Sequence, residues 1–305
     1  MSTSFRKSLP VEFVRNTIAL CGKRGERWLD SLPELIRIFE HQWSLRVHGH
    51  FPNIGYNYVA PASLRDGTLA VLKIGLPLAD VEIFSEAKYL RTLDGRGAVR
   101  LLEEDRTKQA ILIERALPGE TLTSIFEERP MEGVAPAIEV LKQTLQVPPN
   151  DCLDIISLDE WFDGLRRFPG KQFPAEYGER ALEIYDRLSG QPGRTFYLHG
   201  DFHPDNIVSA RRSPFLLIDP KGIIGHVGYE IAVFLNNFHW WQEEKADIKL
   251  RLEAAIALFS DAFNLDPYEI HEWAFAQVVL SAWWTFDEMP DLYHNQVEKA
   301  DIWDV

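Results

Sequence analysis

One short run of the sequence combines residue types that phosphoryl transfer requires. His199-Gly200-Asp201 is followed after four residues by Asn206. Phosphoryl transfer needs a carboxylate that accepts or orients the proton of the attacking hydroxyl, and an oxygen ligand for the magnesium ion that neutralises the phosphates. We expect Asp201 to be the base and Asn206 a metal ligand. A polar surface turn is the alternative, since Gly, Asp, Pro and Asn are common in turns.

A second carboxylate follows shortly downstream. Asp219 comes directly after the apolar run FLLI, which is typical of a buried strand. A carboxylate buried at the end of such a strand is costly unless it is paired or holds a metal. We therefore expect Asp219 to be the main Mg²⁺ ligand. The order of strand, HGD-x4-N, strand and Asp is typical of a kinase catalytic loop followed by its metal-binding Asp.

A lysine in the first third of the chain fits the same chemistry. The run TLAVLKIG places Lys73 on a strand between apolar neighbours, and a helix with Glu82 and Glu86 follows. A kinase uses such a lysine to hold the α and β phosphates, with a Glu of the next helix to position it. We prefer Glu86, because Leu90 and Leu93 continue an apolar face on the same side of that helix. An exposed strand lysine is the alternative.

Two further segments are candidates for nucleotide contact. The connector after ILIE can offer backbone groups to a purine edge, which makes Glu114 to Ala116 candidates. The turn HFPNIGYN is predicted to cover the phosphates, with Gly55 as its single glycine and with Asn53 and Asn57 as residues that tolerate left-handed backbone. The sequence has no G-x-G-x-x-G and no G-x-x-x-x-G-K-[ST], which disfavours a P-loop NTPase and an ordinary protein-kinase glycine loop.

The elements that position these residues divide the chain in two. Helical spacing predicts helices over 11–20 and 26–40, and strands follow over 44–51, 56–62 and 68–75, then a helix over 78–93 and strands over 98–104 and 109–115. Helices then dominate, over 121–129, 136–146, 158–168, 175–188 and from 226 onward, with TFYLHGD and FLLIDP as short strands. We predict an α+β, bilobal architecture. Residues 1–116 would form a nucleotide-binding lobe with a helical extension over 1–42, and residues 117–305 a helical lobe with the catalytic loop and the acceptor site.

Composition limits the partners. The formal net charge of −14 argues against nucleic acid and against anionic lipid. Over residues 240–305 we count 14 acidic against 4 basic residues, an excess that can attract a cationic small molecule or simply be a solvated helix surface. Two distant cysteines do not make a disulfide framework, and no signal peptide or membrane span is recognisable. We expect a soluble cytoplasmic protein.

These motifs together resemble the aminoglycoside phosphotransferase superfamily, most nearly its branch of streptomycin 6-kinases and hydroxyurea phosphotransferases. The residues concerned are LHGDFHPDNIV, IDPKGIIGHVGYEIA, LIERALPGETL, PNIGYNYV before AVLKIG, and HEWAFAQVVLSAWW. The resemblance implies a protein-kinase-like fold and Mg²⁺-dependent transfer from ATP to a hydroxyl, and it gives Asp201, Asn206, Asp219, Lys73 and Glu86 the roles above. One departure is visible: this chain has Glu230 where relatives commonly place an Asp that supports the catalytic loop.

The acceptor is less well indicated than the donor. Streptomycin carries guanidinium groups, so Asp287 and Glu288 after SAWWTF are candidate partners, and Glu243 and Glu244 are weaker ones. All four can equally be solvated helix ends. The tryptophans at 240, 241, 283 and 284 are more typical of a core than of ligand stacking. We interpret His199 as a structural residue of the loop and assign no role to His203.

Three functions fit these observations. The first is an O-phosphotransferase acting on an antibiotic of streptomycin type or a related small molecule. The second is a metabolic kinase for a sugar, amino alcohol or nucleoside, which would use the same residues with another acceptor pocket. The third is a non-catalytic nucleotide-binding module, which is disfavoured because a competent residue occupies every catalytic position.

Overall fold

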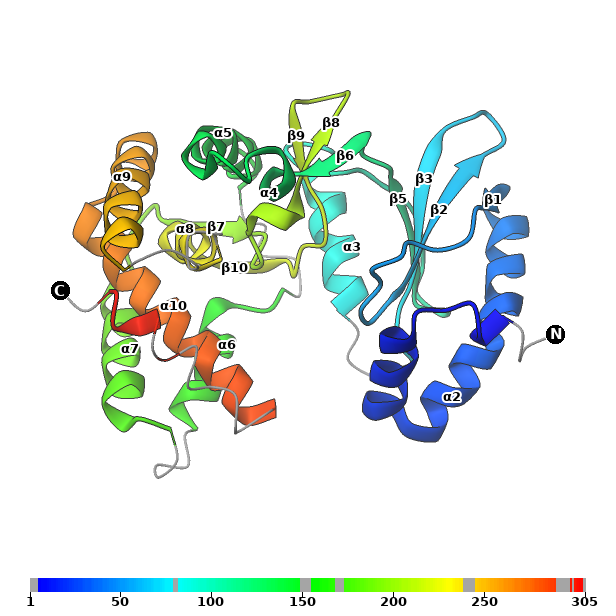
Figure 1. Cartoon of the computed structure of the whole chain (residues 1–305), viewed down its shortest axis with the longest axis horizontal. Helices are drawn as coiled ribbons and strands as arrows, with labels where there is room; N and C mark the ends of the chain where they lie inside the picture. The colour runs from blue at the N-terminus through cyan, green and yellow to red at the C-terminus, as the bar shows by residue number, and fades with distance from the viewer. Residues whose placement is uncertain are drawn as a thin grey trace. The chain divides into compact units, whose positions relative to one another are not determined.

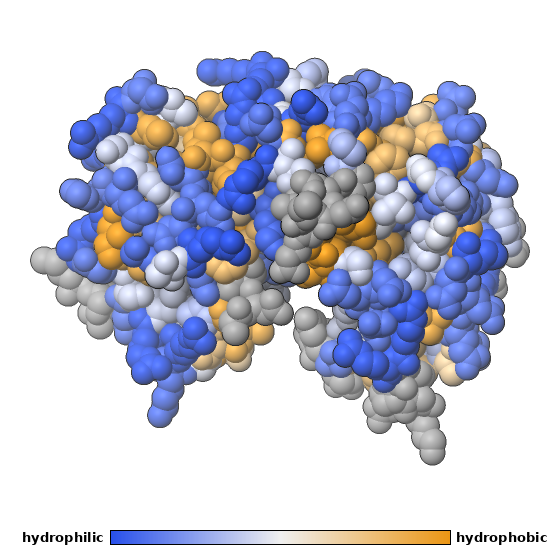
Figure 2. Space-filling model, turned by 180° about the vertical axis from the view of Figure 1, so that it is seen from behind, coloured by the Kyte–Doolittle hydropathy of each residue, from blue (hydrophilic) through white to orange (hydrophobic). Residues whose placement is uncertain are grey.

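The computed structural model describes residues 5–78, 82–148, 155–167, 173–237, 245–288, 297 and 299–303. The chain forms two compact units, Met1–Ala116 and Leu117–Val305 (Figure 1). The first is rich in strand and the second in helix, so the predicted α+β class is confirmed. Among the described residues no helix is both long and apolar enough to cross a membrane. The face drawn in Figure 2 is mostly hydrophilic and is broken by hydrophobic areas.

The first unit is an antiparallel sheet between two helical segments. Its elements are α2 (Val11–Gln42), β1 (Leu45–Val47), β2 (Tyr58–Leu64), β3 (Leu69–Ile74), α3 (Glu82–Leu93), β4 (Leu101–Asp105) and β5 (Ala110–Glu114). The strand order is β1-β2-β3-β5-β4, which puts β3 at the centre. The two predicted N-terminal helices are the two arms of α2, which breaks at Gly22 where φ is 53°.

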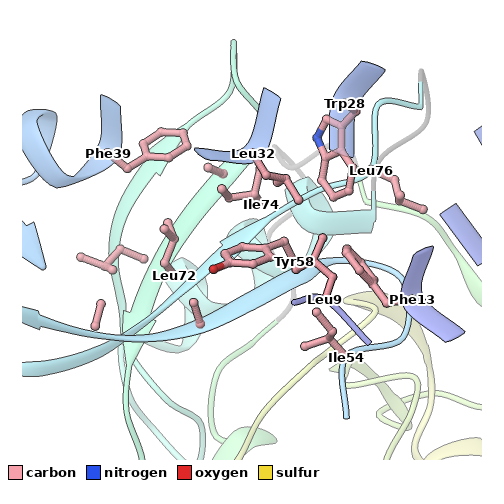
Figure 3. Packing of buried hydrophobic residues seen from close by; sticks show 14 of the residues in the cluster. Leu9, Phe13, Trp28, Leu32, Phe39, Ile54, Tyr58, Leu72, Ile74 and Leu76 are labelled. Carbon is pink, nitrogen blue, oxygen red and sulfur yellow. The ribbon is translucent and has the colours of Figure 1, made fainter. Parts of the chain in front are cut away.

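Strand periodicity divides the residues of β3 between the two faces of this sheet. Ala70, Leu72 and Ile74 belong to a buried cluster with α2, in which Phe13, Trp28, Leu32 and Phe39 meet Tyr58 (Figure 3). Alternation of side chains along a strand sends Lys73 to the opposite face. That is the face where α3 packs on β4 and β5. The local sequence therefore brings a lysine and a helix to the same side of the sheet.

The second unit contains two small sheets and a helical core. Its elements are β6 (Pro118–Thr121), α4 (Leu122–Ile125), a 3-10 turn η1 (Pro130–Gly133), α5 (Val134–Thr144), α6 (Leu158–Arg166), α7 (Ala175–Leu188), β7 (Thr195–Leu198), a 3-10 turn η2 (Pro204–Asn206), β8 (Ile207–Ala210), β9 (Phe215–Leu217), β10 (Ile223–His226), α8 (Val227–Asn236), α9 (Lys245–Phe263) and α10 (Pro267–Glu288). Every residue of α8 is buried, as expected of a helix that is apolar around its circumference. Glu230 is the one charged side chain on it.

The predicted elements of this unit need two corrections. The strands β6, β8 and β10 were not expected, and the helix expected over 121–129 is reduced to the single turn α4. The two predicted strands that flank the loop lie in different sheets: β7 pairs with β10, whereas β9 pairs with β8, which also pairs with β6. The loop of interest therefore joins one small sheet to the other.

Candidate active site

The loop after β7 holds Asp201 in a fixed backbone frame. Gly200 has φ of 79°, a left-handed conformation that glycine adopts without steric cost. The next residue but one, Phe202, is fully buried and packs against Phe234 of α8, with ring centroids 5.7 Å apart. The Asn206 side-chain amide donates to the Asp201 carbonyl oxygen at 2.9 Å and to its Oδ2 at 3.3 Å. The structure thus brings the two predicted loop residues into contact, with the Asn206 amide nitrogen turned toward Asp201.

The side chain of Glu230 supports this loop. Its Oε1 accepts a hydrogen bond from the His199 N–H at 2.6 Å, and its Oε2 accepts one from the Gly200 N–H at 3.0 Å. Complete burial raises the pKa of Glu230 to about 8, although the two N–H donors act to lower it and the Asp201 charge raises it further. The glutamate at this position therefore reaches the catalytic loop through both of its carboxylate oxygens.

His199 is a structural residue, as interpreted from the sequence. Its Nε2 lies 2.8 Å from the Ile218 carbonyl oxygen, and its Nδ1 accepts from the Asp201 N–H at 3.2 Å. These partners assign the proton to Nε2. Burial lowers the pKa of His199 to about 4, against the raising effect of the Asp201 charge. A neutral imidazole therefore ties the loop to the segment that carries Asp219.

The segment that carries Asp219 makes a second hydrogen bond to the loop. The Ile218 N–H donates to the Asn206 carbonyl oxygen at 3.0 Å, so both backbone polar groups of Ile218 bond to the loop. Asp219 is the next residue and has a left-handed backbone with φ of 61°. Such a conformation costs an Asp of the order of 1 kcal/mol, and functional sites retain strain of this kind.

One expectation about Asp219 was wrong. Its side chain is exposed rather than buried, because β9 ends at Leu217 and the chain turns outward at the left-handed residue. The desolvation argument from the sequence therefore does not apply to this carboxylate. Two hydrogen bonds of Ile218, one to Asn206 and one to His199, fix the residue before Asp219 to the loop.

Sequence reasoning missed His203. This side chain caps the η2 turn, where its Nδ1 accepts from the Asp205 N–H at 3.3 Å, and its Nε2 lies 3.6 Å from Asp201 Oδ2. Burial lowers the pKa of His203, but the Asp201 carboxylate outweighs it and the pKa is raised. Burial would likewise raise the pKa of Asp201, but its hydrogen bond and charge interaction with His203, together with the charge of Lys221, keep it below its usual value. Asp201 is thus ionised at neutral pH. A histidine before Pro204 at the start of a turn was the available signal.

In the first unit, Lys73 and Glu86 form a buried ion pair. Lys73 is 5% exposed and Glu86 3% exposed, and the Lys73 Nζ lies 2.6 Å from Glu86 Oε2. The alternative partner, Glu82, is exposed in the first turn of α3. The preference for Glu86 is confirmed as a contact. A buried ion pair often adds little to the stability of a fold, because desolvation of the two charges offsets their attraction. The presence of this pair therefore favours a functional role for Lys73 and Glu86.

The other candidates of the first unit lie at its sheet ends. Asn53 and Gly55 are exposed in the loop between β1 and β2, as predicted, but neither they nor Asn57 have left-handed backbone. The tolerance of these residues for left-handed backbone is not used here, because this loop makes its left-handed turn at Gly49.

At the connector, the backbone donors of the first two candidates are already used. The Glu114 N–H donates to the Arg100 carbonyl oxygen at 2.8 Å, and the Arg115 N–H donates to the Leu69 carbonyl oxygen at 3.3 Å. Each residue has a single backbone donor. Ala116 therefore stays a candidate backbone donor to a purine, and Glu114 stays a candidate only through its carbonyl oxygen, as an acceptor.

The acceptor candidates are placed only in part. Asp287 is exposed in the last turn of α10, and Glu288 ends that helix, with its side chain outside the described residues. Glu243, Glu244, Trp240 and Trp241 also fall outside them. Trp283 is buried against Phe173 and Phe286, so its assignment to the core is confirmed, whereas its neighbour Trp284 is half-buried.

The donor atoms present suit a hard divalent cation. Asn206 offers an amide oxygen and Asp219 a carboxylate, on segments joined by the hydrogen bond between Asn206 and Ile218. Mg²⁺ is usually held by one or two protein oxygen ligands together with phosphate oxygens and water. Among the described residues, no group of three or more His, Cys, Asp or Glu forms a complete protein cage, which agrees with a metal shared with phosphates.

Comparisons with known proteins agree with this chemistry. Residues 42–288 match the family described as aminoglycoside/hydroxyurea antibiotic resistance kinase. The chain is 27% identical to a streptomycin 6-kinase of Streptomyces glaucescens, with 94% of both chains covered, and 29% identical to a hydroxyurea phosphotransferase of Kitasatospora aureofaciens, with 92% of this chain and 81% of that protein covered. A choline kinase from Streptococcus pneumoniae has a similar structure, with a TM-score of 0.61, 16% identity, and coverage of 88% of this chain and 98% of that one. That likeness confirms the protein-kinase-like fold.

Proposed function

This chain belongs to the aminoglycoside/hydroxyurea antibiotic resistance kinase family, and on that basis we propose that it transfers the γ-phosphoryl group of ATP to a hydroxyl of a small molecule. The acceptor is an aminoglycoside of streptomycin type or a related compound. Two observations support this acceptor class: the relatives that cover nearly the whole chain are named for streptomycin and hydroxyurea, and the chain carries a net charge of −14, which suits a cationic acceptor.

The observation that carries the proposal is the supported loop from His199 to Asn206. Glu230 binds two of its backbone amides, His199 ties it to Ile218, and Asn206 contacts Asp201. A loop held this rigidly presents Asp201 in a fixed orientation without reorganisation during the reaction, which is the main source of catalytic advantage in phosphoryl transfer.

Asp201 acts on the acceptor proton. Its pKa is lowered, because the effect of His203 and Lys221 exceeds that of burial, so the carboxylate is ionised and able to accept a hydrogen bond. It orients the acceptor hydroxyl, takes its proton as the oxygen bonds to the γ-phosphorus, and later releases that proton to water. The bond from the γ-phosphorus to the bridging oxygen breaks, and ADP leaves with that electron pair.

The remaining residues hold the donor. Lys73, oriented by Glu86 at 2.6 Å, binds the α and β phosphates. Asn206 through its amide oxygen and Asp219 through its carboxylate would hold Mg²⁺, which would neutralise the charge of the phosphates. Asn53 and Gly55 approach the phosphates, and Ala116 offers its backbone to the purine.

A metabolic kinase is the second candidate. The structural likeness to a choline kinase shows the fold alone at 16% identity, and it brings no acceptor to this chain. The two candidates share Asp201 and differ in the acceptor. A purely nucleotide-binding module would not require an ionised carboxylate beside the metal ligands.

The test is transfer from ATP to a panel of acceptors, among them streptomycin, hydroxyurea, choline and common sugars, with product detected by mass spectrometry. We expect phosphorylated streptomycin or a close analogue, and we expect Asp201→Asn to lower kcat by about 10³-fold. The matched control is Asp205→Asn, the same chemical change four residues on, at an exposed position. Equal activity of both variants would exclude Asp201 as the base. Turnover of choline or a sugar alone would favour the second candidate.

A further inference from the structure

Trp161 of α6 lies directly against the residue that precedes the proposed base. A methyl group on Gly200 would lie 3.0 Å from Cη2 of Trp161 and 3.2 Å from Cβ of Lys221. The tip of the indole therefore borders the loop at the position next to Asp201. No role in the chemistry described above uses this side chain.

A second tryptophan extends this wall. Trp284 of α10 meets Trp161 edge to face, with ring centroids 5.1 Å apart and an interplanar angle of 90°. Both indoles are half-buried, although the residues next to them on the same helices, Phe162 and Trp283, are buried in the core. Both residues are therefore partly packed against the protein and partly accessible, and Trp161 is the one that borders the loop.

We propose that Trp161 and Trp284 form the acceptor-binding wall of the second unit and select a hydroxylated small molecule that carries guanidinium or ammonium groups. This inference rests on the proposed phosphotransferase function and names the substrate class for its acceptor site. Tryptophan is the side chain that binds cations most strongly through its ring face. Asp287 lies one helical turn beyond Trp284 and is exposed, so a carboxylate flanks the aromatic pair.

The charge of the chain supports a cationic acceptor. The net charge is −14, and residues 240–305 have 14 acidic against 4 basic side chains, an excess that attracts cations. A neutral acceptor would gain only apolar contact from the two rings. Selectivity for a cation therefore depends on the indoles rather than on the catalytic loop, which acts on any correctly placed hydroxyl.

Packing alone is the competing explanation, because Trp161 also contacts Tyr229, with ring centroids 5.9 Å apart. The chain offers a matched control for it. Trp283 is adjacent to Trp284 on α10, has the same side chain and is 7% exposed in the core. A purely structural role predicts the same outcome at both positions, namely lower stability without a selective change in acceptor affinity.

The experiment measures the kcat and the KM for streptomycin and for ATP, together with the thermal unfolding midpoint. The proteins compared are the wild type, Trp284→Ala, Trp284→Phe, Trp161→Phe and Trp283→Phe. We expect Trp284→Ala to raise the streptomycin KM about 5- to 30-fold with little change in kcat or in the ATP KM. Trp284→Phe should restore most of that affinity. Trp283→Phe should lower the unfolding midpoint and leave the streptomycin KM unchanged.

Each result has a definite reading. An unchanged streptomycin KM in Trp284→Ala, or an equal rise in Trp283→Phe, would overturn the inference while leaving the phosphotransferase function intact. A wild-type enzyme that phosphorylates only neutral acceptors such as hydroxyurea would overturn the cationic class. If the wild type turned over no acceptor, the proposed function would fail, and calorimetric titration of streptomycin into the wild type and Trp284→Ala would still decide whether this wall binds a cation.

Discussion

The Glu230 carboxyl allows a sharp prediction, because burial and hydrogen bonding act on it in opposite directions. Complete burial raises its pKa to about 8 from an ordinary value of 4.5, whereas the N–H groups of Gly200 and His199 lower it and the Asp201 charge raises it. The change Glu230→Gln keeps the size of the side chain and removes its ability to ionise. The carboxyl and the amide then differ in charge, in the number of N–H groups that they can accept, and in the NH2 donor that the amide adds.

The expected magnitude follows from linkage. A carboxyl whose folded pKa exceeds its unfolded pKa contributes stability that is present below pH 4.5 and is lost as the pH rises through about 8. The loss amounts to roughly 1.4 kcal/mol per pH unit in this window, or about 3 to 4 kcal/mol between pH 5 and pH 8. The Gln variant does not titrate. Its amide carbonyl accepts one N–H and leaves the other without an acceptor, which costs about 1 to 3 kcal/mol at every pH.

These two effects predict a change of sign. At pH 5 we expect Glu230→Gln to be less stable than the wild type, and at pH 8 to be as stable or more stable. The measurement is urea unfolding followed by tryptophan fluorescence at pH 5, 6, 7 and 8, with the difference between variant and wild type taken at each pH. Histidines titrate in both proteins and cancel in that difference. Glu82→Gln, at an exposed position of α3, is the control and should show a flat difference.

A variant that is less stable by the same amount from pH 5 to pH 8 would refute this reasoning. It would mean that the two N–H donors, at 2.6 and 3.0 Å, hold Glu230 ionised in spite of its burial. The same experiment on Glu230→Asp would then measure how much the longer side chain contributes to reaching both amides.

Three further predictions concern the loop and the donor site. Lys73→Met should raise the ATP KM and lower the free energy of unfolding by about 3 to 5 kcal/mol, because Glu86 stays buried without its cation. Adding Glu86→Gln to this variant should restore stability but not activity. Gly200→Ala should cost about 1 to 3 kcal/mol through its left-handed backbone, whereas Gly190→Ala, where a methyl group meets open space, should change the unfolding midpoint little. Asp219→Asn should increase the Mg²⁺ concentration for half-maximal activity about tenfold or more in a metal titration, and EDTA should abolish turnover of the wild type reversibly.

The donor-side residues could be predicted because local rules determine them. A strand alternates its faces and a helix repeats every three to four residues, so Lys73 and Glu86 could be assigned to facing surfaces without knowledge of the whole fold. Their contact at 2.6 Å follows that expectation. Asp201 and Asn206 lie within one short loop, where spacing along the chain already limits their separation.

The strands β6, β8 and β10 of the second unit could not be predicted for the opposite reason. β6 pairs with β8 about 90 residues later in the chain, and β7 pairs with β10 across the catalytic loop. Each has only four residues, too few for a periodic pattern, and Pro118-Gly119 reads as a break rather than as a strand. Their existence depends on non-local pairing, which single-sequence patterns do not contain.

The apolar run before Asp219 shows a related limit. It correctly indicated a buried strand, but burial of a strand does not extend to the residue after its end, and a left-handed turn brings that side chain to the surface. His203 was missed because its proximity to Asp201 depends on the η2 turn that it caps. In both cases one backbone conformation, outside any periodic element, decided where a functional group points.

The two adjacent tryptophans in the last part of α10, Trp283 and Trp284, show why the acceptor site is harder to infer than the donor site. Trp283 and Trp284 are identical in type and adjacent in sequence, yet a rotation of about 100° per residue sends one into the core and leaves the other beside Trp161. Residue type therefore carries no information about which one meets a ligand; only the packing of α10 on α6 does. Donor chemistry constrains residue identity, because only certain groups move protons or bind phosphate, whereas an acceptor wall requires only shape and a π face. The reaction can thus be argued from the sequence, and the acceptor has to be argued from the structure.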